Sequence, residues 1–184
     1  MLLTGAESDA GYKVALTGEG SDEAFAGYIW FKLRKLGYLL DVGGTRTSDT
    51  VNRLLRMRIS PHMSRAKLKR IDDMMGRAHA QTLLYHLVSQ SRDRYFSAAM
   101  KDRLGDYVAY EDVPIDAERV RRWDPLNQSL YYGYKIHLPG LLLNHKGDRV
   151  AMANSVETRY PFLDENVIAF ASKLHPSLKL RGLM

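Results

Sequence analysis

The residue types best suited to chemistry form the sequence Gly-Glu-Gly-Ser-Asp-Glu, which follows a short apolar run near the start of the chain. Gly18 and Gly20 allow backbone conformations and close approaches that a Cβ atom would prevent. Free N–H groups at the start of the helix that should follow favour an anionic ligand such as phosphate. Because Glu19, Asp22 and Glu23 would repel phosphate, a divalent cation is expected between these carboxylates and the phosphate. Mg²⁺ is usually held by one or two carboxylates plus phosphate oxygens. The segment therefore predicts a magnesium–polyphosphate site.

A purely structural interpretation fits the same residues. Ser21 could cap the helix, while Asp22 and Glu23 complement the helix dipole in its first turn. The segment alone does not separate these interpretations, and Ser21 suits a phosphate donor and a helix cap equally well. A second segment, about 120 residues further on, favours the site. It reads Lys146-Gly-Asp-Arg and is followed by Ser-Val-Glu-Thr-Arg-Tyr-Pro-Phe-Leu-Asp.

The two segments, in this order and at this separation, resemble the synthetase domain of glutamine-hydrolysing asparagine synthetase and its relatives. The resemblance is dense over residues 12–40 and 124–182, and the residues between them have a compatible helical pattern. It implies an α/β fold of the ATP-pyrophosphatase type, which is similar to that of adenine nucleotide α-hydrolases. In that fold the first strand leads into a Ser-Gly-Gly-x-Asp-Ser pyrophosphate loop, and this sequence contains no such loop.

The resemblance also implies a mechanism for the parent protein. ATP would adenylate the side-chain carboxylate of aspartate, pyrophosphate would leave, and ammonia from glutamine would displace AMP to give asparagine. Asp22 would bind Mg²⁺, Glu19 would accept a proton from the incoming ammonia, and Lys146 would contact the phosphates or the adenylation transition state. The residues expected beside the nucleotide are Gly18, Gly20 and Ser21. The expected cofactors are therefore ATP and Mg²⁺.

Other charged residues of the second segment have structural alternatives. Without the motif, Lys146 would be read as an ordinary surface lysine. Asp148 and Arg149 are expected to be structural, as partners in a hydrogen-bonded network around that lysine. Glu157 and Arg159 could contact substrate, but a charge pair that orders the chain before the following proline is the favoured interpretation. The six histidines have no spacing typical of a zinc site.

Helix signals dominate after a strand over about residues 13–17. Asp124 followed by proline predicts a helix start, Pro139-Gly140 should break that helix, and Asp164 should cap the last one. The residues just before Pro161 should be extended. The expected helices cover approximately residues 22–36, 48 or 50 to 61, 64–76, 78–90, 93–103, 126–137, 141–153 and 164–174.

One short N-terminal strand followed by a helical lobe is not a complete parallel α/β domain, because such a sheet needs several strands covered on both faces. We therefore expect a mostly helical, C-terminal piece of the synthetase domain. Its expected regions are a strand-turn-helix over 1–40, a helical insert over 41–113 and a helical segment over 114–184. The glutaminase domain of the same parent chain is expected upstream.

Composition agrees with part of an ordinary globular enzyme. The chain has 184 residues and 45% hydrophobic content, which is enough for one domain and its core. No apolar run approaches the length of a membrane span, so no membrane association is expected. The absence of cysteine excludes a disulfide framework and a cysteine nucleophile within this chain, and it fits a cytoplasmic protein. A homodimer is one option for the parent protein.

Two alternative functions follow from the same sequence. The net charge of +6 and the dense positive charge over residues 53–70 suit a nucleic-acid-binding helical module. No helix-turn-helix, zinc-finger or aromatic RNA-binding signature accompanies that charge, which disfavours this alternative. The other alternative keeps the fold and changes the substrate, because relatives of asparagine synthetase amidate or cyclise other carboxylates. The sequence does not distinguish the acceptor carboxylate.

Overall fold

The computed structural model describes residues 2–32, 35, 65–75 and 95–182. Contacts between residues divide the chain into two compact units, Met1–Tyr28 with Leu130–Gly182 and Ile29–Ser129. The first unit therefore combines two segments that are far apart in the sequence, and it contains both motif segments.

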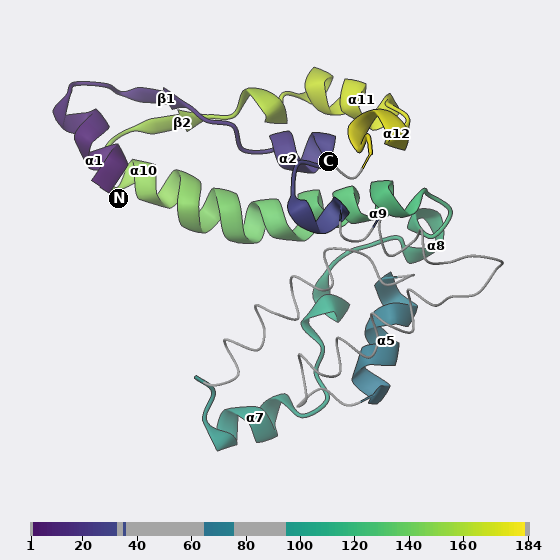
Figure 1. Ribbon diagram of the computed structural model, residues 1–184. Coiled ribbons are helices and arrows are strands. Elements are labelled where there is room, and N and C mark those ends of the chain that lie inside the picture. Colours follow the sequence, from purple (N-terminus) through teal and green to yellow (C-terminus); the bar gives the residue numbers. More distant parts are fainter. Residues whose placement is uncertain (1, 33–34, 36–64, 76–94, 183–184) are drawn as a thin grey trace. The chain divides into compact units, whose positions relative to one another are not determined.

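The first unit is mostly helical and contains a two-stranded sheet (Figure 1). Its elements in chain order are α1 (Leu2–Asp9), β1 (Val14–Leu16), α2 (Ser21–Phe25), the end of α9 (Pro125–Tyr132), η2 (Gly133–Asp148), α10 (Arg149–Met152), β2 (Glu157–Arg159), η3 (Pro161–Leu163), α11 (Glu165–Lys173) and α12 (Pro176–Lys179).

Strands β1 and β2 are parallel, with Val14 opposite Glu157 and Leu16 opposite Arg159. The pairing continues past β1, because the N–H of Thr17 donates to the carbonyl oxygen of Arg159 at 3.0 Å. The expected strand at 13–17 is thus confirmed. The expectation of a single strand is wrong, because the extended segment before Pro161 hydrogen-bonds to β1 and becomes a second strand.

Figure 1 shows η2 and α10 as one continuous helix that runs along the two strands. The predicted helix break at Pro139-Gly140 is wrong, because π-helix η2 continues through both residues. The two residues lie on the exposed side, whereas the flanking Leu138 and Leu142 are buried. Burial of these leucines holds the helix together, and a carbonyl group left without the proline N–H donor can bond to water on the exposed side.

Helix α2 is shorter than the sequence predicts. It ends at Phe25 because Ala26 adopts a left-handed conformation (φ 60°, ψ 42°) and its N–H bonds back to the carbonyl oxygen of Asp22. The N–H of Gly27 reaches the same oxygen at 3.2 Å. The single helix expected over 22–36 is therefore interrupted at residues 26–28, and helix resumes over 29–32.

The second unit contains α5 (Arg65–Met75), α7 (Ala98–Leu104), η1 (Ala109–Asp112), α8 (Ala117–Val120) and the start of α9. The buried hydrophobic residues of this unit include Ile71 of α5, Val120 of α8, and Phe31 and Val108 from outside these elements. Lys67 donates to the carbonyl oxygen of Gly105, and Arg70 forms an ion pair with Glu111. These bonds join α5 to the segment around η1.

The predicted local helix starts are confirmed where side chains set them. Asp124 accepts from the N–H of Leu126 at 2.8 Å, and Asp164 accepts from the N–H of Asn166 at 2.9 Å. The short helices α1 and α12 were not predicted. Several expected features lie outside the described residues: the helix that ends at Pro61, the boundary residues Ser64 and Gly76, and the helix over 78–90. No helix within the described ranges is both long and apolar enough to cross a membrane.

Gly20 is the position where the fold depends most directly on a missing side chain. Its φ is +92°, and a Cβ atom built there would lie 2.2 Å from Cδ2 of Leu163. We predict that Gly20→Ala lowers the free energy of unfolding by about 2–4 kcal/mol, because it adds left-handed strain and overpacking. Urea unfolding provides the measurement. Gly18→Ala is the control, since no atom lies within 4 Å of that Cβ position, and equal losses for both variants would contradict the argument.

Candidate active site

The turn before α2 is closed by a glycine instead of a polar cap. Gly20 (φ 92°, ψ −16°) is the N-cap, and it provides no side-chain hydrogen bond. Ser21 is the first helical residue, and its N–H donates to the carbonyl oxygen of Gly18 at 3.2 Å. The interpretation of Ser21 as the cap is therefore wrong, because the cap position falls one residue earlier. Roles for Gly18, Gly20 and Ser21 toward a nucleotide stay predictions.

The two motif segments pack against each other beyond the sheet. Leu163 of η3 lies against the Cα of Gly20, as the 2.2 Å approach to its absent Cβ shows. Phe162 meets Phe25 of α2 edge to face, with ring centroids 6.3 Å apart. The Pro-Phe-Leu-Asp part of the second segment therefore packs on α2, the helix in which the first segment ends.

Three carboxylates gather at the start of α2. Glu19 and Asp22 are half-buried, whereas Glu23 is 1% exposed. Burial raises the pKa of Glu23; the hydrogen bond from Tyr28 opposes this, and the neighbouring Asp22 and Glu19 add to it. Among the described residues, no cationic side chain pairs with Glu19 or Asp22. The turn is thus a concentration of negative charge with oxygen atoms available to a cation.

A buried polar layer lies behind these carboxylates. The Tyr28 hydroxyl donates to Oε1 of Glu23 at 2.8 Å, and the Tyr28 ring meets the His137 ring edge to face at 5.7 Å. Burial and then the charge of Lys146 lower the pKa of His137, which is 5% exposed. Burial, with a contribution from the Glu23 charge, raises the pKa of Tyr134 to about 12. Contacts therefore run from Glu23 through Tyr28 to His137 of η2, and the charge of Lys146 acts on that histidine.

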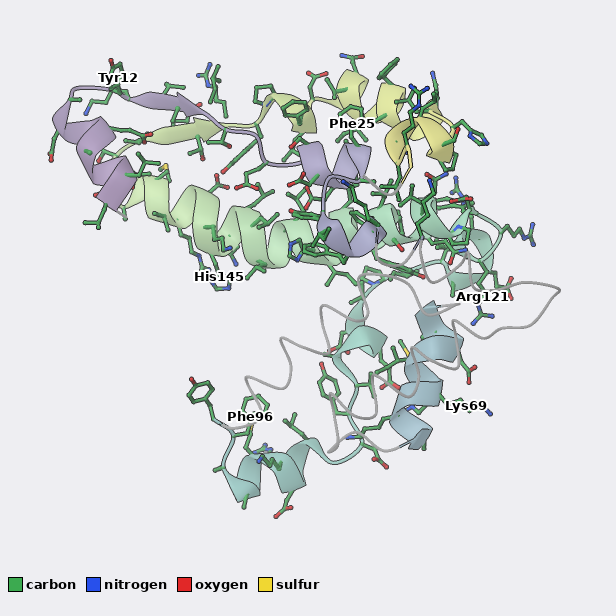
Figure 2. All side chains as sticks on the ribbon, in the orientation of Figure 1. Tyr12, Phe25, Lys69, Phe96, Arg121 and His145 are labelled. Atoms are coloured by element: carbon green, nitrogen blue, oxygen red, sulfur yellow. The ribbon has the colours of Figure 1, made fainter. Side chains whose placement is uncertain are left out.

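The end of η2 is tied to β2 through side-chain oxygens. Asp148 accepts hydrogen bonds from Tyr160 at 2.6 Å and from Thr158 at 3.0 Å. Asp148 therefore has structural partners, as predicted, whereas the expected network around Lys146 stays a prediction. Lys146 itself is exposed, and the neighbouring His145 points away from the strands (Figure 2). A catalytic role for Lys146 stays a prediction, and so does a network role for Arg149.

Glu157 and Arg159 form the charge pair that the sequence favoured. The Nε atom of Arg159 donates to Oε1 of Glu157 at 2.8 Å, and both side chains are exposed. The hydrogen bond and charge of Glu157 raise the pKa of Arg159. Because the two residues flank Thr158 in β2, the pair helps to keep this strand extended before Pro161.

The donor set at the turn fits Mg²⁺ as part of a site shared with substrate. Asp22 and Glu19 supply hard oxygen atoms, and neither makes an ion pair within the described residues. Those residues contain no group of three histidine or acidic side chains close enough to hold a metal alone. Mg²⁺ does not require such a group, because it commonly takes one or two carboxylates and completes its shell with phosphate oxygens and water.

Sequence reasoning missed four side chains of this site: Tyr28, His137, Thr158 and Tyr160. Each of these side chains contacts another residue of the site in the folded unit, and no sequence motif predicts that contact. Tyr28 reaches Glu23 only because α2 ends at Phe25 and the chain turns back. A useful signal was present for Thr158 and Tyr160, whose alternation along an extended segment puts both on the same side of the strand.

The raised pKa of Glu23 predicts a pH-dependent stability. Because folding raises this pKa above 4.5, the folded chain binds more protons than the unfolded chain just above pH 4.5. The stabilising contribution is therefore complete below pH 4.5 and is lost as the pH rises from 4.5 through the folded-state pKa. In Glu23→Gln this loss should disappear, so the variant's free energy of unfolding should fall less steeply between pH 4 and 7.

Urea unfolding at several pH values measures how the free energy of unfolding changes with pH in wild type and in Glu23→Gln. The two slopes are compared, and not the absolute stabilities, because burial of the new amide also changes the stability at every pH. Glu165→Gln, at an exposed position, serves as the control and should keep the wild-type slope. Parallel profiles for wild type and Glu23→Gln would contradict the assignment.

Comparison with known proteins gives consistent similarities over the whole chain. The asparagine synthase family model matches residues 1–184. Amidase chyE of Penicillium rubens is 27% identical, over 100% of this chain and 29% of its own length. Amidase chry2 of Gibberella zeae is 25% identical, over 98% of this chain and 28% of its own. A putative glutamine-hydrolysing asparagine synthetase of Mycobacterium tuberculosis is 31% identical, over 91% of this chain and 25% of its own.

No solved structure matches the chain significantly. The chain spans between 25% and 29% of the length of these three relatives, so each comparison concerns one part of a longer protein. Within that part, the family match covers both motif segments and the residues between them. The chain belongs to the asparagine synthase family.

Proposed function

We propose that the protein containing this chain is an ATP-dependent ligase that adenylates a carboxylate and then transfers ammonia to it. One observation carries the proposal: the β1–β2 pairing and the Gly20–Leu163 contact bring two distant motif segments into one compact unit. The family match supports the same activity. We further propose the ATP-pyrophosphatase type of fold for the complete domain, with the two parallel strands as part of its sheet.

The proposed first step forms an acyl-adenylate. A carboxylate oxygen of the substrate attacks the α-phosphorus of ATP, and the bond to the leaving pyrophosphate breaks. Lys146 places a positive charge near the phosphates, where the charge develops in the transition state. Asp22 would hold Mg²⁺, which supplies charge neutralisation for the pyrophosphate when it is bound.

The proposed second step forms the amide. The nitrogen of ammonia attacks the acyl carbon, the bond to the AMP oxygen breaks, and Glu19 takes a proton from the nitrogen. Glu19 suits this role because it is half-buried at the turn and makes no ion pair within the described residues, so its carboxylate oxygens can accept a proton. In this proposal ammonia comes from glutamine, through a glutaminase domain in the rest of the parent chain.

We propose the aspartate side chain as the acceptor carboxylate, on the strength of the asparagine synthetases among the relatives. A second candidate is a ligase that amidates another carboxylate, because two relatives carry the name amidase. Comparing AMP release with aspartate and with other carboxylic acids separates the two candidates.

The nucleic-acid alternative loses part of its support from the described basic residues. Lys67 and Arg70 of α5 are already bonded to the segment around η1. Lys69 and Arg121 are exposed basic residues of the second unit (Figure 2). The rest of the basic run, at residues 53–64, lies outside the described residues.

We predict that two substitutions separate the two steps in the full-length parent protein. Lys146→Ala should lower ATP–pyrophosphate exchange by about 10²–10³-fold, because it removes a charge that stabilises the adenylation transition state. Glu19→Ala should leave that exchange within a few fold and lower amide formation by about 10²-fold, as expected for loss of a general base. Isotope exchange and amide product are measured on the same samples.

Lys135→Ala is the matched control, since Lys135 is another exposed lysine of η2 and lies over the Tyr131 ring. It should behave as wild type in both assays. Unchanged exchange in Lys146→Ala would reject the role of the lysine, and unchanged amide formation in Glu19→Ala would reject that of the glutamate.

We also predict that Asp22→Asn raises the Mg²⁺ concentration needed for half-maximal exchange, because the amide keeps the shape but loses the charge. Gly27→Ala should act in the same direction, since its Cβ atom would lie 1.9 Å from Oδ1 of Asp22 and would displace that carboxylate. Asp9→Asn, at an exposed position of α1, is the control. A Mg²⁺ titration that matches wild type in Asp22→Asn would refute the metal assignment.

A further inference from the structure

Three side-chain oxygens form a closed group between the end of η2 and β2. Oδ1 of Asp148 accepts from Tyr160 at 2.6 Å and from Thr158 at 3.0 Å, and the two hydroxyl oxygens are 2.7 Å apart. Asp148 is the last residue of η2, Thr158 is central in β2, and Tyr160 follows the strand. The group therefore fixes the end of one element against the other at a single point.

The Tyr160 hydroxyl also touches the backbone next to Lys146. A Cβ atom on Gly147 would lie 2.6 Å from Oη of Tyr160, so the phenol occupies the space that any other residue would need. Gly147 is buried, whereas Lys146 and Asp148 on either side of it are exposed. Tyr160 thus contacts the two residues that follow Lys146, one by packing and one by a hydrogen bond.

Tyr160 is at the same time within electrostatic reach of Glu19. Burial and the hydrogen bond to Asp148 raise the pKa of Tyr160, and the charge of Glu19 raises it further. The strand before Tyr160 pairs with β1, which leads directly into the turn that carries Glu19. One side chain therefore lies beside the backbone of Lys146 and in the field of Glu19.

We propose that Tyr160 is a positioning residue for Lys146: its hydroxyl group, bonded to Asp148 and seated on Gly147, sets where the lysine backbone lies relative to β2 and Glu19. This inference rests on the proposed function, in which Lys146 acts in adenylation. Tyr160 contacts no substrate atom in this assignment. Its effect is geometric, and a displacement of about 1 Å at a catalytic group can lower a rate by about 10²-fold.

The test is Tyr160→Phe in the full-length parent protein, with ATP–pyrophosphate exchange as the assay. We expect kcat for exchange to fall about 10- to 100-fold, while KM for ATP and for the carboxylate substrate stays within about twofold. The matched control is Tyr107→Phe, because the exposed Tyr107 hydroxyl also donates to an aspartate, Asp112, but belongs to the second unit. Tyr107→Phe should keep the wild-type kcat.

A double-mutant cycle identifies the route of the effect. If Tyr160 acts through Lys146, the Tyr160→Phe change should lower kcat in the wild-type background and have no further effect in a Lys146→Ala background. An equal loss in both backgrounds would overturn the inference and leave only a general structural role. If Tyr160→Phe fails to fold, as circular dichroism would reveal, Thr158→Val replaces it and should give the same background-dependent loss on a smaller scale.

The outcomes also separate this inference from the proposed function. If Lys146→Ala loses exchange but Tyr160→Phe matches Tyr107→Phe, the positioning role is wrong and the proposed function stands. If Lys146→Ala keeps full exchange, the proposed role of the lysine fails, and the positioning inference fails with it.

Discussion

The candidate site depends on the pairing of two three-residue strands, β1 and β2. Each strand leads into functional residues, so the register of Leu16 with Arg159 determines which residues of the two segments face each other. A slip by one residue would turn every side chain of a strand to the opposite face and would break the Asp148–Thr158–Tyr160 group. The contact between Gly20 and Leu163 supports the same register independently, because a shifted pairing of β1 with β2 would move the leucine side chain away from the glycine.

Features set by neighbouring residues could be predicted from the sequence, and features set by distant ones could not. The starts of α9 and α11 follow from Asp124 and Asp164, whose side chains bond to N–H groups two residues ahead. The continuity of η2 through Pro139 depends instead on the burial of Leu138 and Leu142 in the folded unit. For the site, the motifs identified the exposed and half-buried charged groups. His137 could not be assigned, because its neighbour Tyr28 lies more than a hundred residues away in the sequence.

Accessible charged residues and buried polar residues lie close together along α2 and along η2. Exposed and half-buried charges, those of Glu19, Asp22 and Lys146, lie where a substrate could reach them, while Glu23 and His137 are almost fully covered. A buried carboxylate is costly unless hydrogen-bonded, and Tyr28 supplies that bond on one of its two oxygens. This arrangement places a hydrogen-bonded polar pair beside the half-buried Glu19 and Asp22, and under the proposed adenylating function that pair would help to preorganise the turn.

The division of the first unit between two distant segments has a consequence for synthesis on the ribosome. β2 is made about 140 residues after β1, which at about 5–20 residues per second corresponds to a delay of roughly 7–30 s. During that delay β1 has no β2 partner, and its exposed Leu16 and Val14 remain available to other extended segments. The nascent chain therefore most needs chaperone protection after the turn at Gly20 has emerged and before β2 has been made.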